Sequence, residues 1–140
     1  MTYSINNKYL ENEVLAADPL KLVVILYRAA LEAVGAARRH LSAGAISERS
    51  RQITRAWEMI SELLRTLDPA RGGEIARSLA DLYGYMQTRL IEANFAQSDA
   101  PLAEVETLLT TLLEAWRSLV PPTSASADIE HEYAPVSCTA

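Results

Sequence analysis

The sequence predicts an all-α fold, an antiparallel up-down-up-down four-helix bundle with a short N-terminal helix or arm and a disordered C-terminal tail. Apolar residues make up 49% of the 140 residues, Leu and Ala dominate them, and runs of β-branched residues are rare. They recur at spacings of three and four in four segments of roughly 20 residues, which connections of about five residues separate. This pattern is typical of a helical bundle, and the length suits one domain with its own core.

The first long helix is expected from Asp18 to about Leu41. Asp18 is a suitable cap, Pro19 suits the first helical position, and Gly44 closes the helix. Two apolar stripes run along it, one of Leu22, Leu26, Ala30, Ala33, Ala37 and Leu41 and one of Val24, Tyr27, Leu31 and Val34. Together they are about twice as wide as the roughly 100° stripe that one bundle helix needs.

The second helix is expected from Ser47, a suitable cap, to about Leu67. Its stripe consists of Ile53, Ala56, Trp57, Ile60, Leu63, Leu64 and Leu67. We expect the Asp-Pro pair at residues 68–69 to end this helix. Residues 71–73, Arg-Gly-Gly, are expected to form the turn into the third helix.

The third helix is expected over residues 72–94. The fourth is expected to follow Asp99, a suitable cap, and to run to about Leu119. The third carries a stripe of Ile75, Leu79, Leu82, Met86 and Leu90, which Tyr83 and Tyr85 widen. The fourth repeats apolar residues by three and four at Leu102, Val105, Leu109, Leu112, Trp116 and Leu119. Residues 1–17 are expected to form a mobile arm, residues 18–120 the bundle, and residues 121–140, rich in Pro, Ser and Ala, a disordered tail.

Charge and hydropathy argue against nucleic acid or membrane as partners. The formal net charge is −5, and three of the acids, Asp128, Glu130 and Glu132, lie in the tail, so the bundle is close to neutral. The longest apolar run, Leu22 to Tyr27, is far too short to span a membrane, and the N-terminus does not resemble a signal peptide. We therefore expect a cytoplasmic protein without membrane insertion.

A cluster of arginines flanks the first interhelical turn. Its members are Arg38, Arg39, Arg49, Arg51 and Arg55. A nucleic-acid site would need aromatic stacking residues among them, and only Trp57 is near. A solvated turn is the favoured interpretation, and contact with an acidic partner comes second.

The sequence offers no residues in a catalytic or cofactor-binding pattern. The two histidines, His40 and His131, do not form the Glu-x-x-His pairs of a di-metal bundle, and Cys138 stands alone near the C-terminus. Glu58 and Glu62 lie one turn apart on the polar side of their helix. We expect no enzyme, no metal and no cofactor, although a small helical-bundle enzyme or metalloprotein stays a rival interpretation.

The surplus of apolar residues is the remaining functional signal. It indicates either a groove for an amphipathic helix from another chain or a face for self-association. A homo-oligomeric bundle that acts as a scaffold or adaptor is therefore the alternative to a helix-binding protein.

Several segments, in order and spacing, resemble the flagellar secretion chaperone family, FliS. The resemblance covers about residues 9–119 and is most specific in Gly72-Gly73-Glu74-Ile75-Ala76, Leu82-Tyr83-x-Tyr85-Met86 and Arg89-Leu90-Ile91-Glu92-Ala93-Asn94. Ala17-Asp18-Pro19 and Leu26-Tyr27 also contribute. The resemblance implies an antiparallel helical bundle that binds the C-terminal helical region of flagellin, prevents premature polymerisation and delivers it to the flagellar type III export apparatus.

The resemblance and the surplus together predict a set of partner-binding residues, with flagellin and an export gate component as the partners. The set is Tyr9, Val24, Tyr27, Leu31, Ile60, Leu64, Tyr83, Tyr85, Met86 and Leu90. We also expect the arm, through Tyr3, Ile5 and Tyr9, to cover the groove when no client is bound, because an exposed apolar groove favours aggregation.

Overall fold

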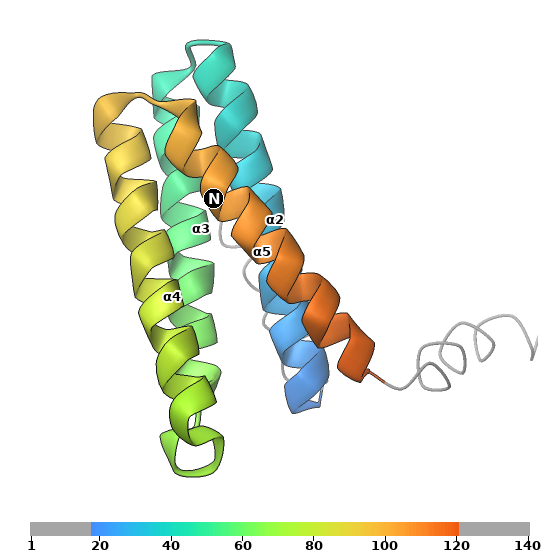
Figure 1. Ribbon diagram of the computed structural model, residues 1–140. Helices are drawn as coiled ribbons and strands as arrows, with labels where there is room; N and C mark the ends of the chain where they lie inside the picture. Colours follow the sequence, from blue (N-terminus) through green and yellow to red (C-terminus); the bar gives the residue numbers. More distant parts are fainter. Residues whose placement is uncertain (1–17, 121–140) are drawn as a thin grey trace, which may run out of the picture.

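A computed structural model describes residues 18–120 as four antiparallel α-helices, and the predicted all-α fold is confirmed (Figure 1). The helices are α2 (Pro19–Ser42), α3 (Ile46–Thr66), α4 (Pro69–Ala96) and α5 (Asp99–Leu119). The predicted arm at residues 1–17, with Tyr9, and the predicted tail at residues 121–140 lie outside the described residues.

The helices are arranged so that each one packs on two others. Helix α2 packs on α3 and α5, and α4 packs on the same two helices, so α2 and α4 lie diagonally opposite. This arrangement explains the double stripe of α2, because a helix between two neighbours buries more than one face. Most of the second stripe of α2 is therefore buried between its two neighbours, and Leu31 is half-buried.

Two helix starts follow the capping chemistry of an Asp-Pro pair. The Asp18 carboxylate accepts a hydrogen bond of 2.9 Å from the backbone N–H of Lys21, and the Asp68 carboxylate accepts one of 3.1 Å from that of Ala70. Each aspartate is followed by a proline in the first helical position, where no backbone donor is needed. Residues 68–69 therefore begin α4 as well as ending α3.

The expected turn at residues 71–73 is a kink inside α4. Gly73 has φ +52° and ψ −125°, a conformation that L side chains rarely adopt. A Cβ atom on Gly72 would lie 2.7 Å from Cβ of Ala76, which is buried. The glycine pair thus allows both the kink and the close approach of its backbone to Ala76.

Two other predicted caps are wrong. Ser47 lies within the first turn of α3, which begins at Ile46 after Ala45, a residue whose side chain cannot cap. Asp99 is the first residue of α5 rather than its cap, because Ser98 occupies the capping position without a side-chain hydrogen bond. Serine and aspartate favour the whole first turn of a helix, so composition alone does not fix the start.

The bundle has two ends that differ in packing. At the closed end, where α4 turns into α5, the buried side chains are Met86, Leu90 and Ala93 of α4 and Leu102, Val105 and Leu109 of α5. Toward the splayed end, α5 leads away from α4, and the lower parts of α2 and α3 also separate in the view of Figure 1. On α4 and α5, the side chains that are fully buried therefore lie mostly toward the closed end.

Candidate partner-binding surface

Apolar side chains with accessible area gather on the helix segments that diverge. Ile75 near the start of α4 is 73% exposed, and Leu119 at the end of α5 is 63% exposed. Half-buried neighbours line the same segments and pack against the core. We call the set the splayed-end surface; its members are Leu64, Leu67, Ile75, Leu79, Leu82, Leu112, Trp116 and Leu119.

The predicted partner-binding residues divide into buried and accessible groups. The buried group, with exposures between 0 and 8%, is Val24, Tyr27, Ile60, Tyr83, Met86 and Leu90. Leu31 and Leu64 are half-buried, and Tyr85 is 45% exposed. Because Tyr9 lies outside the described residues, only Leu31, Leu64 and Tyr85 have appreciable accessible area. The binding role of the whole set stays a prediction.

Tyr27 and Tyr83 meet across the diagonal of the bundle. Their hydroxyl oxygens are 2.7 Å apart, and their rings lie edge to face with centroids 6.2 Å apart. This hydrogen bond joins α2 to α4, the two helices that lie diagonally opposite. Burial raises the pKa of both tyrosines, and both hydroxyls are neutral hydrogen-bonding groups at ordinary pH.

Tyr85 takes part in a polar contact between α4 and α5. Its hydroxyl donates to the Glu104 carboxylate over 2.8 Å, and Nε of Arg89 donates to the same oxygen over 2.6 Å. Arg89 also pairs with Glu92 over 2.8 Å. Hydrogen bonds from Tyr85 and Arg89 lower the pKa of Glu104, so this predicted binding residue already helps to join two helices.

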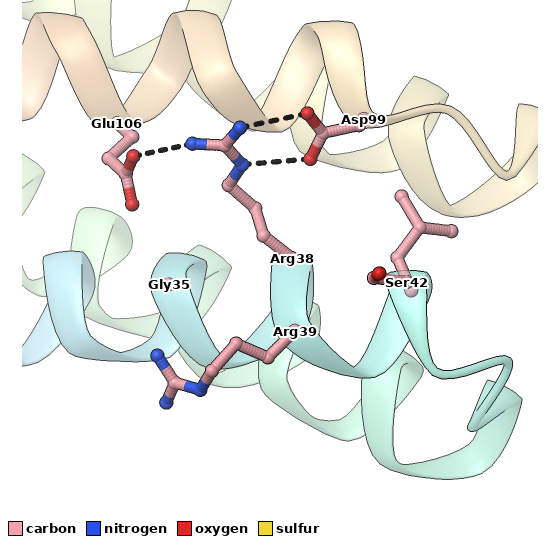
Figure 2. A pocket seen from close by; sticks show the side chains of 7 residues that line it. Gly35, Arg38, Arg39, Ser42, Asp99 and Glu106 are labelled. Carbon is pink, nitrogen blue, oxygen red and sulfur yellow. Dashed lines mark hydrogen bonds and ion pairs between the residues drawn. The ribbon is translucent and has the colours of Figure 1, made fainter.

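Arg38 joins α2 to α5 beside a polar hollow near the closed end (Figure 2). Its guanidinium donates to both Asp99 oxygens, over 2.8 and 2.9 Å, and to Glu106 over 2.7 Å. The hydrogen bond from Arg38 lowers the pKa of Asp99. The hollow has a volume of about 760 Å³ and is lined by Gly35, Arg38, Arg39, Leu41, Ser42, Asp99 and Glu106. Its carboxylates are already paired with Arg38, so they hold the helices together rather than offering free ligands.

Neither metal nor membrane chemistry is visible in the described part of the chain. Residues 18–120 contain no group of three His, Cys, Asp or Glu side chains placed to hold a metal ion. Over the same residues, none of the helices combines the length and apolar character that crossing a bilayer requires.

Sequence reasoning assigned several splayed-end residues to the core. Ile75, Leu79 and Leu82 were expected in the stripe of the third helix, and Leu112, Trp116 and Leu119 in that of the fourth. The stripe is present, but the diverging helices leave its outer members accessible, most clearly Ile75 and Leu119. Trp57, also expected in the core, is 38% exposed. Periodicity gives the face of a helix and does not show where two helices separate.

The fold and its accessible apolar surface define a helical-bundle protein suited to binding another chain. Residues 1–123 match the model of the family described as "Flagellar protein FliS". The chain belongs to this family of flagellar secretion chaperones. That membership, rather than any missing site, confirms the expectation that the protein is not an enzyme.

Named relatives support this assignment over most of both chains. The chain is 36% identical over 115 residues to the flagellar secretion chaperone FliS of Salmonella typhimurium, which covers 81% of this chain and 85% of the relative. It is 36% identical to FliSB of Pseudomonas aeruginosa over 76% of this chain and 85% of the relative. It is 30% identical to FliS of Bacillus subtilis over 80% of this chain and 83% of the relative.

Proposed function

We propose that this protein is a cytoplasmic export chaperone that holds the C-terminal helical region of flagellin on the splayed-end surface. The observation that carries the proposal is the accessible apolar area where α4 and α5 diverge. The name shared by the relatives, flagellar secretion chaperone, supports a role in flagellar export. In this role the protein prevents premature polymerisation and delivers its client to the flagellar type III export apparatus, where an export gate component receives it.

In this proposal, an apolar contact between chaperone and flagellin replaces the apolar contact between two flagellin copies. A flagellin helix that polymerises through its apolar stripe is kept apart from other copies when the chaperone covers that stripe. Ordering a flexible client segment costs several kcal/mol, so a large contact area still permits release. A complex of this kind is stable enough to prevent assembly and weak enough to be unloaded.

The predicted binding residues have two roles in this proposal. Leu64 lies on the splayed-end surface, and Leu31 and Tyr85 add accessible area elsewhere on the bundle. The buried residues Tyr27 and Tyr83 lie beneath the surface, and their hydrogen bond fixes the spacing of α2 and α4; we call this pair the floor. The floor therefore affects binding through the shape of the surface rather than through direct contact.

Calorimetric titration with a C-terminal flagellin fragment tests the proposed location. Ile75→Glu and Leu119→Glu each place a charge on a well-exposed apolar position of the splayed end. We expect each to weaken binding about tenfold or more, because a buried unpaired carboxylate is costly at an interface. Phe95→Glu is the matched control, since Phe95 is 91% exposed but lies at the closed end.

Undiminished binding by both splayed-end variants contradicts the location. Loss of binding in Phe95→Glu alone would move the client to the closed end. If wild type does not bind the fragment while sedimentation shows a stable homodimer, the alternative of a self-associating scaffold replaces the proposed function.

A further inference from the structure

A second accessible apolar patch lies at the closed end, where α3 begins and α4 ends. Ile46 and Ile91 are each 58% exposed, and Phe95 is the most exposed of the large apolar side chains described. Hydrogen bonds from Arg49 and Ser50 to Asn94 fix the register of the two helices here. Ile46 stands one turn before Arg49, Ile91 one turn before Asn94, and Phe95 directly after it. We call these three apolar residues the closed-end patch.

Arg49 lies beside this patch with part of its guanidinium unused. Its Nε donates to the side-chain oxygen of Asn94 over 3.1 Å, and one amino group reaches the Asn94 carbonyl over 3.5 Å. The residue is only 5% exposed, and no carboxylate in residues 18–120 pairs with it. The sequence interpretation of Arg49 as part of a solvated turn is therefore wrong.

The second amino group of Arg49 is the part of the guanidinium that none of these contacts uses. It has no hydrogen-bond partner in the described part of the chain, yet no fully enclosed side-chain nitrogen or oxygen there lacks a partner. This nitrogen therefore keeps some solvent-exposed area, although the residue as a whole is buried. A guanidinium in such a position is ready to bind a carboxylate in a fork geometry.

The nearest carboxylates on the two helices are engaged elsewhere. Glu48 accepts from Arg51 over 3.2 Å, and Glu92 accepts from Arg89 over 2.8 Å. The charge of Arg49 thus has only amide and carbonyl dipoles of Asn94 opposite it. An apolar surround reduces screening by water, so a carboxylate arriving here interacts more strongly than at an open surface.

We propose that the closed-end patch docks an amphipathic helix of a second protein, whose apolar anchors cover the patch and whose Asp or Glu pairs with Arg49. Apolar side chains at i, i+3 or i+4 and i+7 of that helix match the seam between two antiparallel helices. The carboxylate sets the register, because only one position along the seam offers the free amino group. Nucleic acid fits poorly, since the site offers one available cation and no stack of accessible aromatic rings along a basic groove.

Docking at the closed-end patch does not require flagellin to be the client of the splayed-end surface. The closed-end patch and the splayed-end surface use different parts of α4, Ile91 and Phe95 in one case and Ile75 to Leu82 in the other. A protein with both surfaces can hold two partners at the same time. The docking surface is therefore testable on the chain alone, without the client.

Two synthetic helical peptides serve as probes for the full chain. Both carry Leu at i, i+4 and i+7; one carries Glu at i+3, and the other carries Gln there. Fluorescence anisotropy of labelled peptides is expected to show saturable binding, about tenfold tighter for the Glu peptide, as a charged hydrogen bond at a partly dehydrated site implies. In Arg49→Met this preference is expected to disappear.

Thermal melting shows whether Arg49→Met is folded. If it is not, substitutions at exposed positions of the patch provide the test instead. Phe95→Asp and Ile46→Asp are expected to lower the affinity for the Glu peptide about tenfold, because each introduces a negative charge that repels the peptide's Glu. Ile75→Asp, at the splayed end, is the control and is expected to leave that affinity unchanged.

Equal affinities of the Glu and Gln peptides, or no saturable binding, overturn the proposal. So does a Phe95→Asp variant that binds the Glu peptide as wild type does. Concentration-dependent self-association that Phe95→Asp abolishes also overturns it, because a second copy of the chain would then occupy the patch.

Discussion

At the closed end of the bundle, α4 and α5 face each other with side chains that are fully buried, whereas at the splayed end the same two helices leave leucines half-covered. Leu102 and Leu112 illustrate the contrast on one helix, the first buried and the second half-buried. The helices and their apolar periodicity are the same at both ends, so the difference comes from their divergence. One part of the bundle supplies stability, and the other retains apolar area for a partner.

The largest expected effect compares two identical substitutions along α5. Leu102→Ala removes a fully buried side chain and is expected to lower the free energy of unfolding by about 2–4 kcal/mol. Leu112→Ala removes a half-buried one and is expected to cost about 1 kcal/mol. Urea unfolding of both variants measures the difference, and equal losses would contradict the contrast between the two ends.

The tyrosine pair tests how the two ends are connected. Tyr27→Phe leaves the buried Tyr83 hydroxyl without its partner and is expected to cost about 1–3 kcal/mol. Tyr83→Phe leaves the buried Tyr27 hydroxyl without its partner in the same way and is expected to cost about 1–3 kcal/mol. The double variant should cost less than the sum, because its two changes remove the same hydrogen bond. An additive double-mutant cycle would show that the hydroxyls act independently.

Two glycines of α4 offer a smaller, matched comparison. Gly73→Ala places a side chain at φ +52° and is expected to destabilise by about 1 kcal/mol, since alanine disfavours this region. Gly84→Ala lies in regular helix with open space around the added methyl group and is expected to stabilise by about 0.5–1 kcal/mol. Thermal melting gives the signs; stabilisation by Gly73→Ala would mean that the kink is not required.

The smallest expected effect is acid sensitivity of the contacts between α5 and its neighbours. The pKa values of Asp99 and Glu104 are lowered from 3.8 and 4.5 by their hydrogen-bond donors, Arg38 in one case and Tyr85 and Arg89 in the other. Their contribution is therefore complete above these ordinary values and is lost as the pH falls through the lower values of the folded state. Both groups are exposed, so the change is small. Urea midpoints between pH 6 and pH 3 should fall less in Arg38→Gln than in wild type; identical curves would contradict the role of Asp99.

The sequence predicted the helices well because their signals are local. The Asp-Pro pairs at residues 18–19 and 68–69 mark helix starts through capping and the fixed φ of proline. The kink at Gly73 was less predictable, because Gly72-Gly73 is equally compatible with a turn between helices. Helix starts that lack a side-chain hydrogen bond, at Ala45 and Ser98, were misplaced by one or two residues.

The surface was less predictable because it depends on how the helices are placed. Tyr27 and Tyr83 belong to apolar stripes in the sequence, and only the arrangement of four helices shows that their hydroxyls meet in the core. Ile75 belongs to a core stripe by spacing but lies on a segment that has separated from α5. Arg49 gives no sequence signal of burial, since its partner Asn94 is 45 residues away.

Hydrogen exchange of the full chain, with and without a C-terminal flagellin fragment, tests the central claim most directly. If the splayed-end surface holds the client, backbone amides in residues 75–82 of α4 and 112–119 of α5 gain protection on binding. The closed-end segment at residues 86–96, whose inward side chains are already buried, should change little. Protection confined to that closed-end segment, with residues 75–82 and 112–119 unchanged, would contradict the account.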